Sequence, residues 1–320
     1  MSLPEGLSRR WVKRASLLAR LHPLWRSSLQ GARQIVFLTG EAGIGKTTLI
    51  ELFLAEIAEQ APSVLRARCV EHFGQGEALL PLLEAIEHPC RTERGASLIG
   101  RLRRHAPVWL AQLPSVLASE EREALQREIL GASRERMLRE GCLLVEELCG
   151  AAPLVLVVED LHWSDHATLD FLALLAQRNP PARLLVLASY RPGDAAFHTH
   201  PVTTLHQELQ LRGLGVELPL EPFSPADAEE FLVRRFPGSP ILSSVVQALY
   251  AQTGGHPLFL ANLVDYLVAQ RQWSPQDSSI TLNRALPDTV RRVIDREIER
   301  LSAEEQRVLG IASAIGAEFS

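Results

Sequence analysis

The chain has 320 residues, of which 46% are hydrophobic and 22% charged, and its formal net charge is −5. This composition is ordinary for a globular protein, and the length allows two or three domains. The negative net charge argues against a dedicated nucleic-acid binder, since such proteins are strongly basic. It is still compatible with a small basic face on part of the surface.

The sequence shows no sign of a membrane span or a secretory signal. No apolar run reaches the roughly 18 residues that a spanning helix needs, and the first 20 residues lack an apolar core followed by a small-residue cleavage site. Four cysteines lie far apart and form no C-x-x-C pair: Cys69, Cys90, Cys142 and Cys149. We therefore expect buried thiols in a reduced, cytoplasmic compartment. Cys69 and His72 are neighbours without the further ligands that a zinc site requires.

The first half of the chain alternates between strand and helix patterns. Residues 1–30 are predicted to form a helical lead-in, with an amphipathic stretch from Trp11 to Leu24. A strand at 34–38, a helix at 45–60 and a second strand at 63–69 follow. Residues 77–150 are predicted to be mostly helical, because apolar residues such as Leu144 and Leu148 recur at helical spacing.

Two continuous apolar runs, 153–158 and 183–189, predict strands that are buried on both faces of a parallel sheet. A helix at 169–176 separates them, and 215–220 predicts a shorter fifth strand. This alternation favours a doubly wound α/β fold. After Pro222 only helices are expected. The predicted domains are thus the lead-in 1–30, an α/β core at 31–222, a helical segment at 223–273, and a linker with the beginning of a truncated domain at 274–320.

The most specific motif is a complete G-x-x-x-x-G-K-[ST] phosphate-binding loop between the first strand and the first helix. In that context a glycine-rich turn that matches by chance is disfavoured. Glycines let backbone N–H groups point at an anion, and the helix start adds a partial positive charge. Lys46 is expected to reach the β- and γ-phosphates, and the Thr47 hydroxyl to bind Mg²⁺. The expected nucleotide contacts are Gly40, Glu41, Ala42, Gly43, Ile44, Gly45, Lys46, Thr47 and Thr48.

Acidic and basic groups follow the two later strands. Glu159 and Asp160 end the run at 153–158, as expected of a neighbouring strand whose carboxylates hold Mg²⁺ and orient water; a solvated turn is the alternative. Arg191 ends the next strand, where it is expected to sense the γ-phosphate unless it is a surface arginine. His162 and Trp163 are expected to pack between this turn and the phosphate loop rather than to catalyse, and Asp165 to cap the next helix.

Other charged clusters are best explained as solvated helix surfaces. Arg101, Arg103, Arg104 and His105 lack the interleaved aromatic residues of a nucleic-acid patch. Arg136 and Glu140 are spaced for an i,i+4 pair.

Four segments occur in an order that resembles the AAA-type ATPase module of STAND signal-transduction proteins, as in large LuxR-type transcriptional regulators and multidomain bacterial cyclases and kinases. They are the phosphate loop, Val-Val-Glu-Asp-Leu-His-Trp-Ser-Asp at 157–165, Ser-Tyr-Arg-Pro-Gly-Asp at 189–194, and Thr-Gly-Gly-His-Pro-Leu-Phe-Leu at 253–260. The stretch 286–319 is similar to the start of the winged-helix segment that follows that module.

The resemblance implies a P-loop NTPase core with a helical lid. It assigns Lys46 and Thr47 to the phosphates and Mg²⁺, Glu159 and Asp160 to the Walker B acids, and Arg191 to the sensor. Pro257 of the lid is expected to touch adenine. The family's Val-Gly-Arg-Glu start, which contributes to the adenine pocket, reads Val-Lys-Arg-Ala at 12–15: the glycine and the acidic residue are changed, while Arg14 remains and is expected to contact adenine.

We therefore expect an ATP- and Mg²⁺-dependent, slowly hydrolysing switch within a larger regulator, with effector sensing and output outside this chain and a capacity for nucleotide-dependent self-association. ATP is favoured over GTP because no guanine-specific Asn/Thr-Lys-x-Asp run is present. A DNA-associated loader of the origin-recognition type is the alternative, disfavoured by the mixed charges of 290–300. A phosphotransferase is a weaker alternative, because no acceptor-binding motif is present.

Overall fold

The computed structural model describes residue 12 and residues 14–71, 77–92, 95–113, 115–270, 272–274, 298 and 306–310. The described residues divide into two compact units, one of residues 14–221 and one that begins at Pro222 and takes in Val12. The linker and winged-helix start predicted for 274–320 lie almost wholly outside the described residues, as does His72.

The first unit is built on five parallel strands in the order β2-β3-β4-β1-β5. Their bounds are β1 Gln34–Thr39, β2 Ser63–Arg68, β3 Leu154–Glu159, β4 Leu184–Tyr190 and β5 Val216–Pro219. The three inner strands are almost wholly buried, as their apolar sequences require when helices cover both faces. At the edges, β2 alternates between buried and exposed side chains, and β5 is only four residues long.

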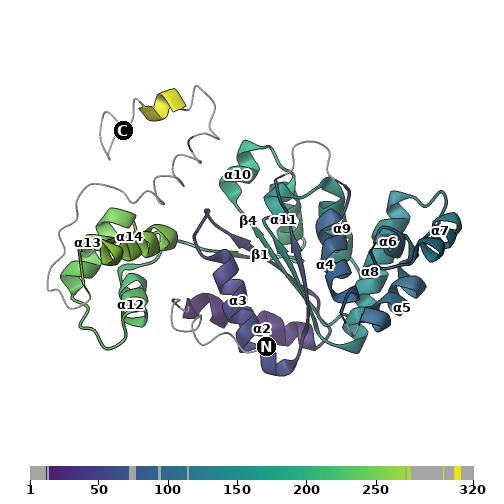
Figure 1. Ribbon diagram of the computed structural model, residues 1–320, viewed down its shortest axis with the longest axis horizontal. Coiled ribbons are helices and arrows are strands. Elements are labelled where there is room, and N and C mark those ends of the chain that lie inside the picture. Colours follow the sequence, from purple (N-terminus) through teal and green to yellow (C-terminus); the bar gives the residue numbers. More distant parts are fainter. Residues whose placement is uncertain are drawn as a thin grey trace. The chain divides into compact units, whose positions relative to one another are not determined.

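Helices lie on both sides of this sheet (Figure 1). On one side α2 (Ala15–Leu29) contacts α3 (Lys46–Glu56), and on the other α9 (His166–Ala176) contacts α8 (Arg134–Ala151) and α11 (Val202–Leu211). From β1 the chain crosses the sheet to β2 at its edge, and it then returns through β3 to β4. Because connections between parallel strands are right-handed, helices in connections that run in opposite directions lie on opposite faces of the sheet. The predicted P-loop α/β fold is confirmed.

The segment between β2 and β3 is helical, as predicted. It contains α4 (Leu80–Cys90), α5 (Gly95–His105), α6 (Pro107–Ala111), α7 (Ser119–Glu128) and α8. Trp109 lies at its centre and donates its indole N–H to the carbonyl of Met137 at 2.7 Å. A Cβ on Gly141 of α8 lies 2.4 Å from the Trp109 ring, so this helix approaches the indole closely only because glycine has no side chain.

The described part of the second unit comprises α12 (Pro225–Arg235), α13 (Ser243–Thr253) and α14 (Pro257–Ala269). A capping box between Ser224 and Asp227 starts α12. The α13–α14 turn is fixed by Gly255, whose carbonyl accepts from Phe223 N–H at 2.8 Å and whose φ is +73°. A Cβ there lies 2.2 Å from the Phe223 carbonyl oxygen, so only glycine fits.

The four cysteines are buried and unbridged. Burial raises the pKa of Cys69 to about 12 and that of Cys90 to about 11, which keeps both thiols protonated and unreactive. In the part of the chain that the structure describes, no helix combines the length and apolarity of a membrane span.

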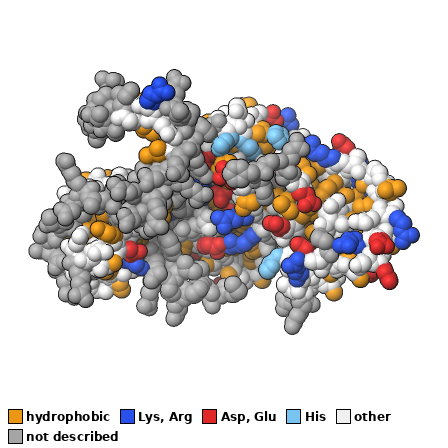
Figure 2. All heavy atoms as spheres, turned by 45° about the horizontal axis from the view of Figure 1, so that its top comes forward, with side chains coloured by type: hydrophobic (Ala, Val, Ile, Leu, Met, Phe, Trp, Pro, Cys, Tyr) orange, Lys and Arg blue, Asp and Glu red, His pale blue; other side chains and the backbone are white. Residues whose placement is uncertain are grey.

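The predicted charged helix surfaces carry acidic partners. Arg101 lies 3.9 Å from Glu147 and Arg103 lies 3.3 Å from Glu121, while Arg136 and Glu140 form the expected i,i+4 pair at 2.8 Å. The prediction of a solvated surface is wrong for Glu140, which is buried because its other oxygen accepts from the Val108 N–H at 2.8 Å. On the face drawn in Figure 2, Lys and Arg side chains are interspersed with Asp and Glu among the described residues. This distribution gives the described part of that face no broad positive field for nucleic acid.

Candidate nucleotide-binding site

The phosphate loop joins β1 to α3 and depends on glycine for its shape. Gly40, Gly43 and Gly45 have φ angles of +147°, +73° and +101°, which other residues adopt only with strain. At Gly40 a Cβ lies 2.7 Å from the Leu220 carbonyl oxygen, so the loop also lacks room for a side chain at this point. Gly45 precedes α3 directly and leaves the first N–H groups of that helix without a side-chain cap, as anion binding at a helix start requires.

Lys46, the first residue of α3, folds back over its own loop. Its Nζ donates to the carbonyl oxygens of Gly40 at 2.7 Å and Glu41 at 2.9 Å, and the residue is only 7% exposed. Burial, with a further contribution from the positive charge of Arg191, lowers the pKa of Lys46 to about 8. Burial disfavours the charged form of Lys46, and a nearby anion favours it. A bound phosphate therefore raises the pKa of Lys46 again, and the two groups stabilise each other.

Thr47 links the phosphate loop to the acidic pair. Its hydroxyl donates to Oε2 of Glu159, the last residue of β3, at 2.5 Å. Asp160 follows with a left-handed φ of +55°, and its backbone N–H donates to the Ser189 hydroxyl at 3.2 Å. A threonine hydroxyl beside a carboxylate is a donor set that Mg²⁺ accepts in nucleotide-binding loops.

Glu159 and Asp160 were predicted to end a strand that neighbours β1, the strand before the phosphate loop. This prediction is wrong. Strand β4 lies between β1 and β3, and β3 pairs only with β2 and β4. Because all carboxyl ends of a parallel sheet lie at one edge, Glu159 still reaches Thr47 across β4.

Arg191 follows β4 directly, at the same edge of the sheet. Its Nη1 donates to Asp194 Oδ2 at 3.1 Å, within the first turn of α10 (Pro192–Phe197). Both side chains are about one-fifth exposed, so the guanidinium is neither free in solvent nor sealed in the core. The structure thus brings together five predicted groups at one edge: Lys46, Thr47, Glu159, Asp160 and Arg191.

A family profile described as AAA ATPase domain matches residues 10–187. The chain belongs to the AAA ATPase domain family. Nucleotide binding follows from this membership, and Mg²⁺ usually accompanies it. An uncharacterized protein of Rhizobium meliloti is 23% identical over 291 residues, which cover 88% of this chain and 26% of the relative. The chain thus spans about a quarter of the length of that relative.

Two solved structures show similarity at 16% identity. A Walker-type ATPase of Pyrococcus abyssi aligns with 95% of this chain and 75% of its own, with a TM-score of 0.49. A STAND protein with a tetratricopeptide repeat sensor, from Pyrococcus horikoshii, aligns with 92% of this chain and 34% of its own, with a TM-score of 0.45.

Arg14 is hydrogen-bonded to the backbone of the phosphate loop of the AAA domain. Its guanidinium donates to the Ile44 carbonyl at 2.7 Å and to the Glu221 carbonyl at 2.8 Å. These bonds tie the loop to the end of the α/β unit, in addition to any contact with adenine. Of the remaining predicted contacts, Pro257 begins α14 in the other unit, and Ala42 and Thr48 are half-buried around the loop.

The turn after the acidic pair is packed against α10. His162 is buried and lies 3.4 Å from Asp194. Its ring centroid is 5.0 Å from that of Trp163, which is in turn 5.1 Å from that of His198, and both ring pairs are tilted. His162 and Trp163 were predicted to pack between this turn and the phosphate loop; the structure shows them in contact with Asp194 of α10 and with His198, which follows α10. Asp165 caps α9 as predicted, accepting from the Thr168 N–H at 3.0 Å.

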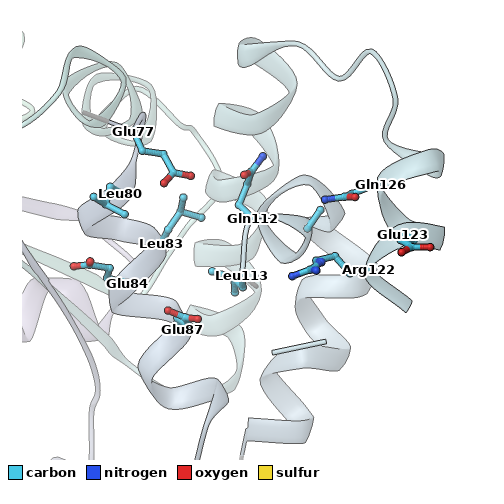
Figure 3. Close-up of a pocket in the computed structure, with 11 residues that line it drawn as sticks. Glu77, Leu80, Leu83, Glu84, Glu87, Gln112, Leu113, Arg122, Glu123 and Gln126 are labelled. Carbon is cyan, nitrogen blue, oxygen red and sulfur yellow. The ribbon is translucent and has the colours of Figure 1, made fainter. Parts of the chain in front are cut away.

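A separate pocket of about 540 Å³ lies between α4, α6 and α7 (Figure 3). It contains none of the predicted site residues. Four carboxylates line it against a single arginine, Arg122, and the carboxylates belong to Glu77, Glu84, Glu87 and Glu123. Such an excess of negative charge repels a triphosphate, so this pocket is not the nucleotide site.

Two residues at the site had no assigned role in the sequence analysis. Ser189 fixes the backbone of Asp160, and Asp194 pairs with Arg191. Asp194 stands three residues after Arg191 and two after a proline, which is the spacing for a helix start with an i,i+3 ion pair. That spacing was the available signal. Ser189 follows no such pattern, because its hydroxyl bonds the backbone of a residue that is distant in the sequence.

Proposed function

We propose that this AAA domain binds ATP with Mg²⁺ at the phosphate loop, hydrolyses it slowly, and serves as the switch of a larger regulatory protein of the STAND class. The hydrogen bond between Thr47 and Glu159 is the observation that carries the proposal. It joins the loop that a triphosphate requires to the carboxylate that its metal requires, although the two residues are 112 positions apart.

In this proposal each side chain has a distinct task. Lys46 and the loop N–H groups hold the β- and γ-phosphates, while Thr47 and Glu159 hold Mg²⁺. The metal supplies charge neutralisation on the phosphate oxygens. Asp160 orients the attacking water, and Arg191 contacts the γ-phosphate. No step requires a covalent intermediate, because catalysis of phosphoryl transfer rests on positioning and charge.

The regulatory part of the proposal rests on sequence resemblance and on length. The segments at 157–165, 189–194 and 253–260 follow the STAND pattern, and the curated relative is far longer than this chain. We propose that the helices α12 to α14 act as a lid that contacts adenine through Pro257. The γ-phosphate then shifts the protein between two states only to the extent that it binds one of them more tightly.

Nucleotide binding and turnover by purified protein test the catalytic proposal. Lys46→Ala is expected to abolish most ATP binding measured by calorimetry. Replacing Glu159 by Gln together with Asp160 by Asn is expected to leave binding while removing phosphate release. Full hydrolysis by that double variant contradicts the site assignment.

Limited proteolysis tests the switch. Wild type is expected to give different cleavage patterns with ATP and with ADP, and equal patterns contradict a two-state switch. Filter binding to DNA at two salt concentrations distinguishes the loader alternative, which requires a steep loss of affinity with salt.

A further inference from the structure

Asp194 occupies a central position among the charged groups of the site. Its Oδ2 atom accepts from Arg191 at 3.1 Å and lies 3.4 Å from Nε2 of His162. It also contributes to the electrostatic field at Lys46, where it favours the charged form. One carboxylate therefore faces three groups that carry, or can carry, positive charge around the place proposed for the γ-phosphate.

The chemistry of Asp194 toward Arg191 is the chemistry of a phosphate. Both a carboxylate and a phosphoryl group present acceptor oxygens to the forked guanidinium, and arginine binds either one in the same way. Asp194 accepts from Nη1 of Arg191, so a phosphate that needs this donor competes with the carboxylate for it.

We propose that Asp194 is a stand-in for the γ-phosphate: it holds Arg191 while no triphosphate is bound, and ATP exchanges this carboxylate for its own terminal phosphate. ADP lacks that phosphate and leaves the Arg191–Asp194 pair intact. This inference rests on the proposed function and deepens it, since it assigns a positioning residue that sets the preference for ATP over ADP.

The contacts around Asp194 connect the proposed exchange with the turn that follows Glu159 and Asp160. His162, which faces Asp194, lies in the turn Leu161–Trp163 directly after Glu159 and Asp160. Trp163 of the same turn contacts the ring of His198, the residue that follows α10, in a tilted arrangement. The ring nitrogens of His162 make no hydrogen bond within the described part of the chain, and Nε2 lies 3.4 Å from the Asp194 carboxylate. Release of Asp194 by Arg191 thus alters a contact with the turn that carries the proposed metal and water ligands.

A purely structural role for Asp194 is the competing explanation. An acidic residue in the first turn of a helix stabilises that helix through the backbone dipole, whatever the bound nucleotide. This explanation predicts that neutralising Asp194 lowers the melting temperature and leaves the ratio of ATP to ADP affinity unchanged. A general effect of charge predicts that both nucleotides bind more tightly, ATP somewhat more because it carries one more negative charge, and that this change persists without Arg191.

The decisive measurement is the ratio of dissociation constants for ADP and for ATPγS, a slowly hydrolysed ATP analogue, in excess Mg²⁺. For Asp194→Asn the ratio is expected to shift in favour of ATPγS by about three- to fivefold, the range of a partly exposed ion pair. In the Arg191→Ala background the same substitution is expected to leave the ratio unchanged, which is the signature of a direct coupling.

Two controls separate the inference from other causes. Glu41→Gln removes another carboxylate near the start of α10, since its Oε1 lies 3.9 Å from the Cβ position of Gly193. Any shift in its ratio is expected to be the same with and without Arg191. Asp194→Ala, which favours helix at this position inside α10, provides the same test should the Asn variant not fold.

A coupled shift in the ratio supports the exchange. An equal change for both nucleotides, or a shift that persists without Arg191, overturns it. If wild type binds neither nucleotide, the proposed function itself is wrong; if wild type binds both and only the ratio fails to respond, the failure belongs to this inference alone.

Discussion

The hydroxyl of Thr47 and the carboxylate of Glu159 meet at 2.5 Å, across the strand that separates β1 from β3. This contact predicts that Thr47→Val, which keeps the side-chain shape and removes the hydroxyl, weakens ATP binding about tenfold or more in Mg²⁺ and much less in EDTA, since a charge-assisted contact to the metal is lost. Titration of ATP in both buffers measures the difference. Thr47→Ser keeps the hydroxyl and serves as the matched control, and an equal loss in both buffers contradicts a metal role.

Arg14 holds the Ile44 carbonyl of the phosphate loop and the Glu221 carbonyl at the same time. Arg14→Ala is expected to weaken ATP and ADP by a similar factor, about fivefold, because the loop loses two charge-assisted hydrogen bonds without losing a phosphate ligand. Arg20→Ala is the control, since Arg20 also donates to a backbone carbonyl, that of Glu217, but does not touch the loop. Unchanged affinity in Arg14→Ala shows that the loop holds its shape without this arginine.

Two glycines of α8 provide a matched test of the helical core. A Cβ on Gly141 meets the Trp109 ring at 2.4 Å, whereas one on Gly150 meets nothing within 4 Å. Gly141→Ala is therefore expected to lower the free energy of unfolding by about 1–3 kcal/mol through overpacking. Gly150→Ala is expected to raise it by up to about 1 kcal/mol, because alanine favours helix. Urea denaturation measures both, and equal effects contradict the close approach at Trp109.

His206 is buried against Phe37 and accepts or donates at 2.7 Å with the hydroxyl of Tyr190, with Glu217 3.9 Å away. Desolvation lowers the pKa of His206 below its ordinary value of 6.5, and Glu217 only partly opposes the shift. The unfolded chain thus binds a proton more readily below about pH 6.5, so the stability linked to His206 is present above that pH and is lost as the pH falls.

His206→Gln removes this titration while keeping a polar partner for Tyr190. The loss of stability between pH 7.5 and pH 5.5, measured by urea denaturation, is expected to be smaller in the variant than in wild type. His200 has a pKa lowered by burial and remains in both proteins, so it does not affect the comparison. The same loss in both proteins contradicts the assignment to His206.

The order of elements and the phosphate loop were predictable from sequence because both are local patterns. Apolar runs identified the inner strands, and the loop motif has a fixed length between strand and helix. Strand order is a property of the whole sheet. Nothing in the residues of β3 shows that β4, rather than β3, lies beside β1.

The first helix shows how burial overrides a local rule. The helical lead-in predicted for residues 1–30 covers α2, which runs from Ala15 to Leu29, but the amphipathic stretch was predicted to end at Leu24, whereas the helix continues through Pro23. Trp25 and Ser28, beyond the proline, are fully buried, and the Trp25 indole donates to Gln60 at 2.5 Å. These contacts with distant residues sustain the helix where proline weakens it.

The outer strands of the sheet bear on how the domain behaves when it is produced alone. An unpaired strand edge invites other chains to add to it, and proteins oppose this with short strands, prolines and exposed charges. Strand β5 has four residues and ends at Pro219, and β2 exposes Arg66 and Arg68. Both borders of the sheet are thus poor templates for amyloid-like growth, which favours recovery of the isolated segment in a monodisperse form.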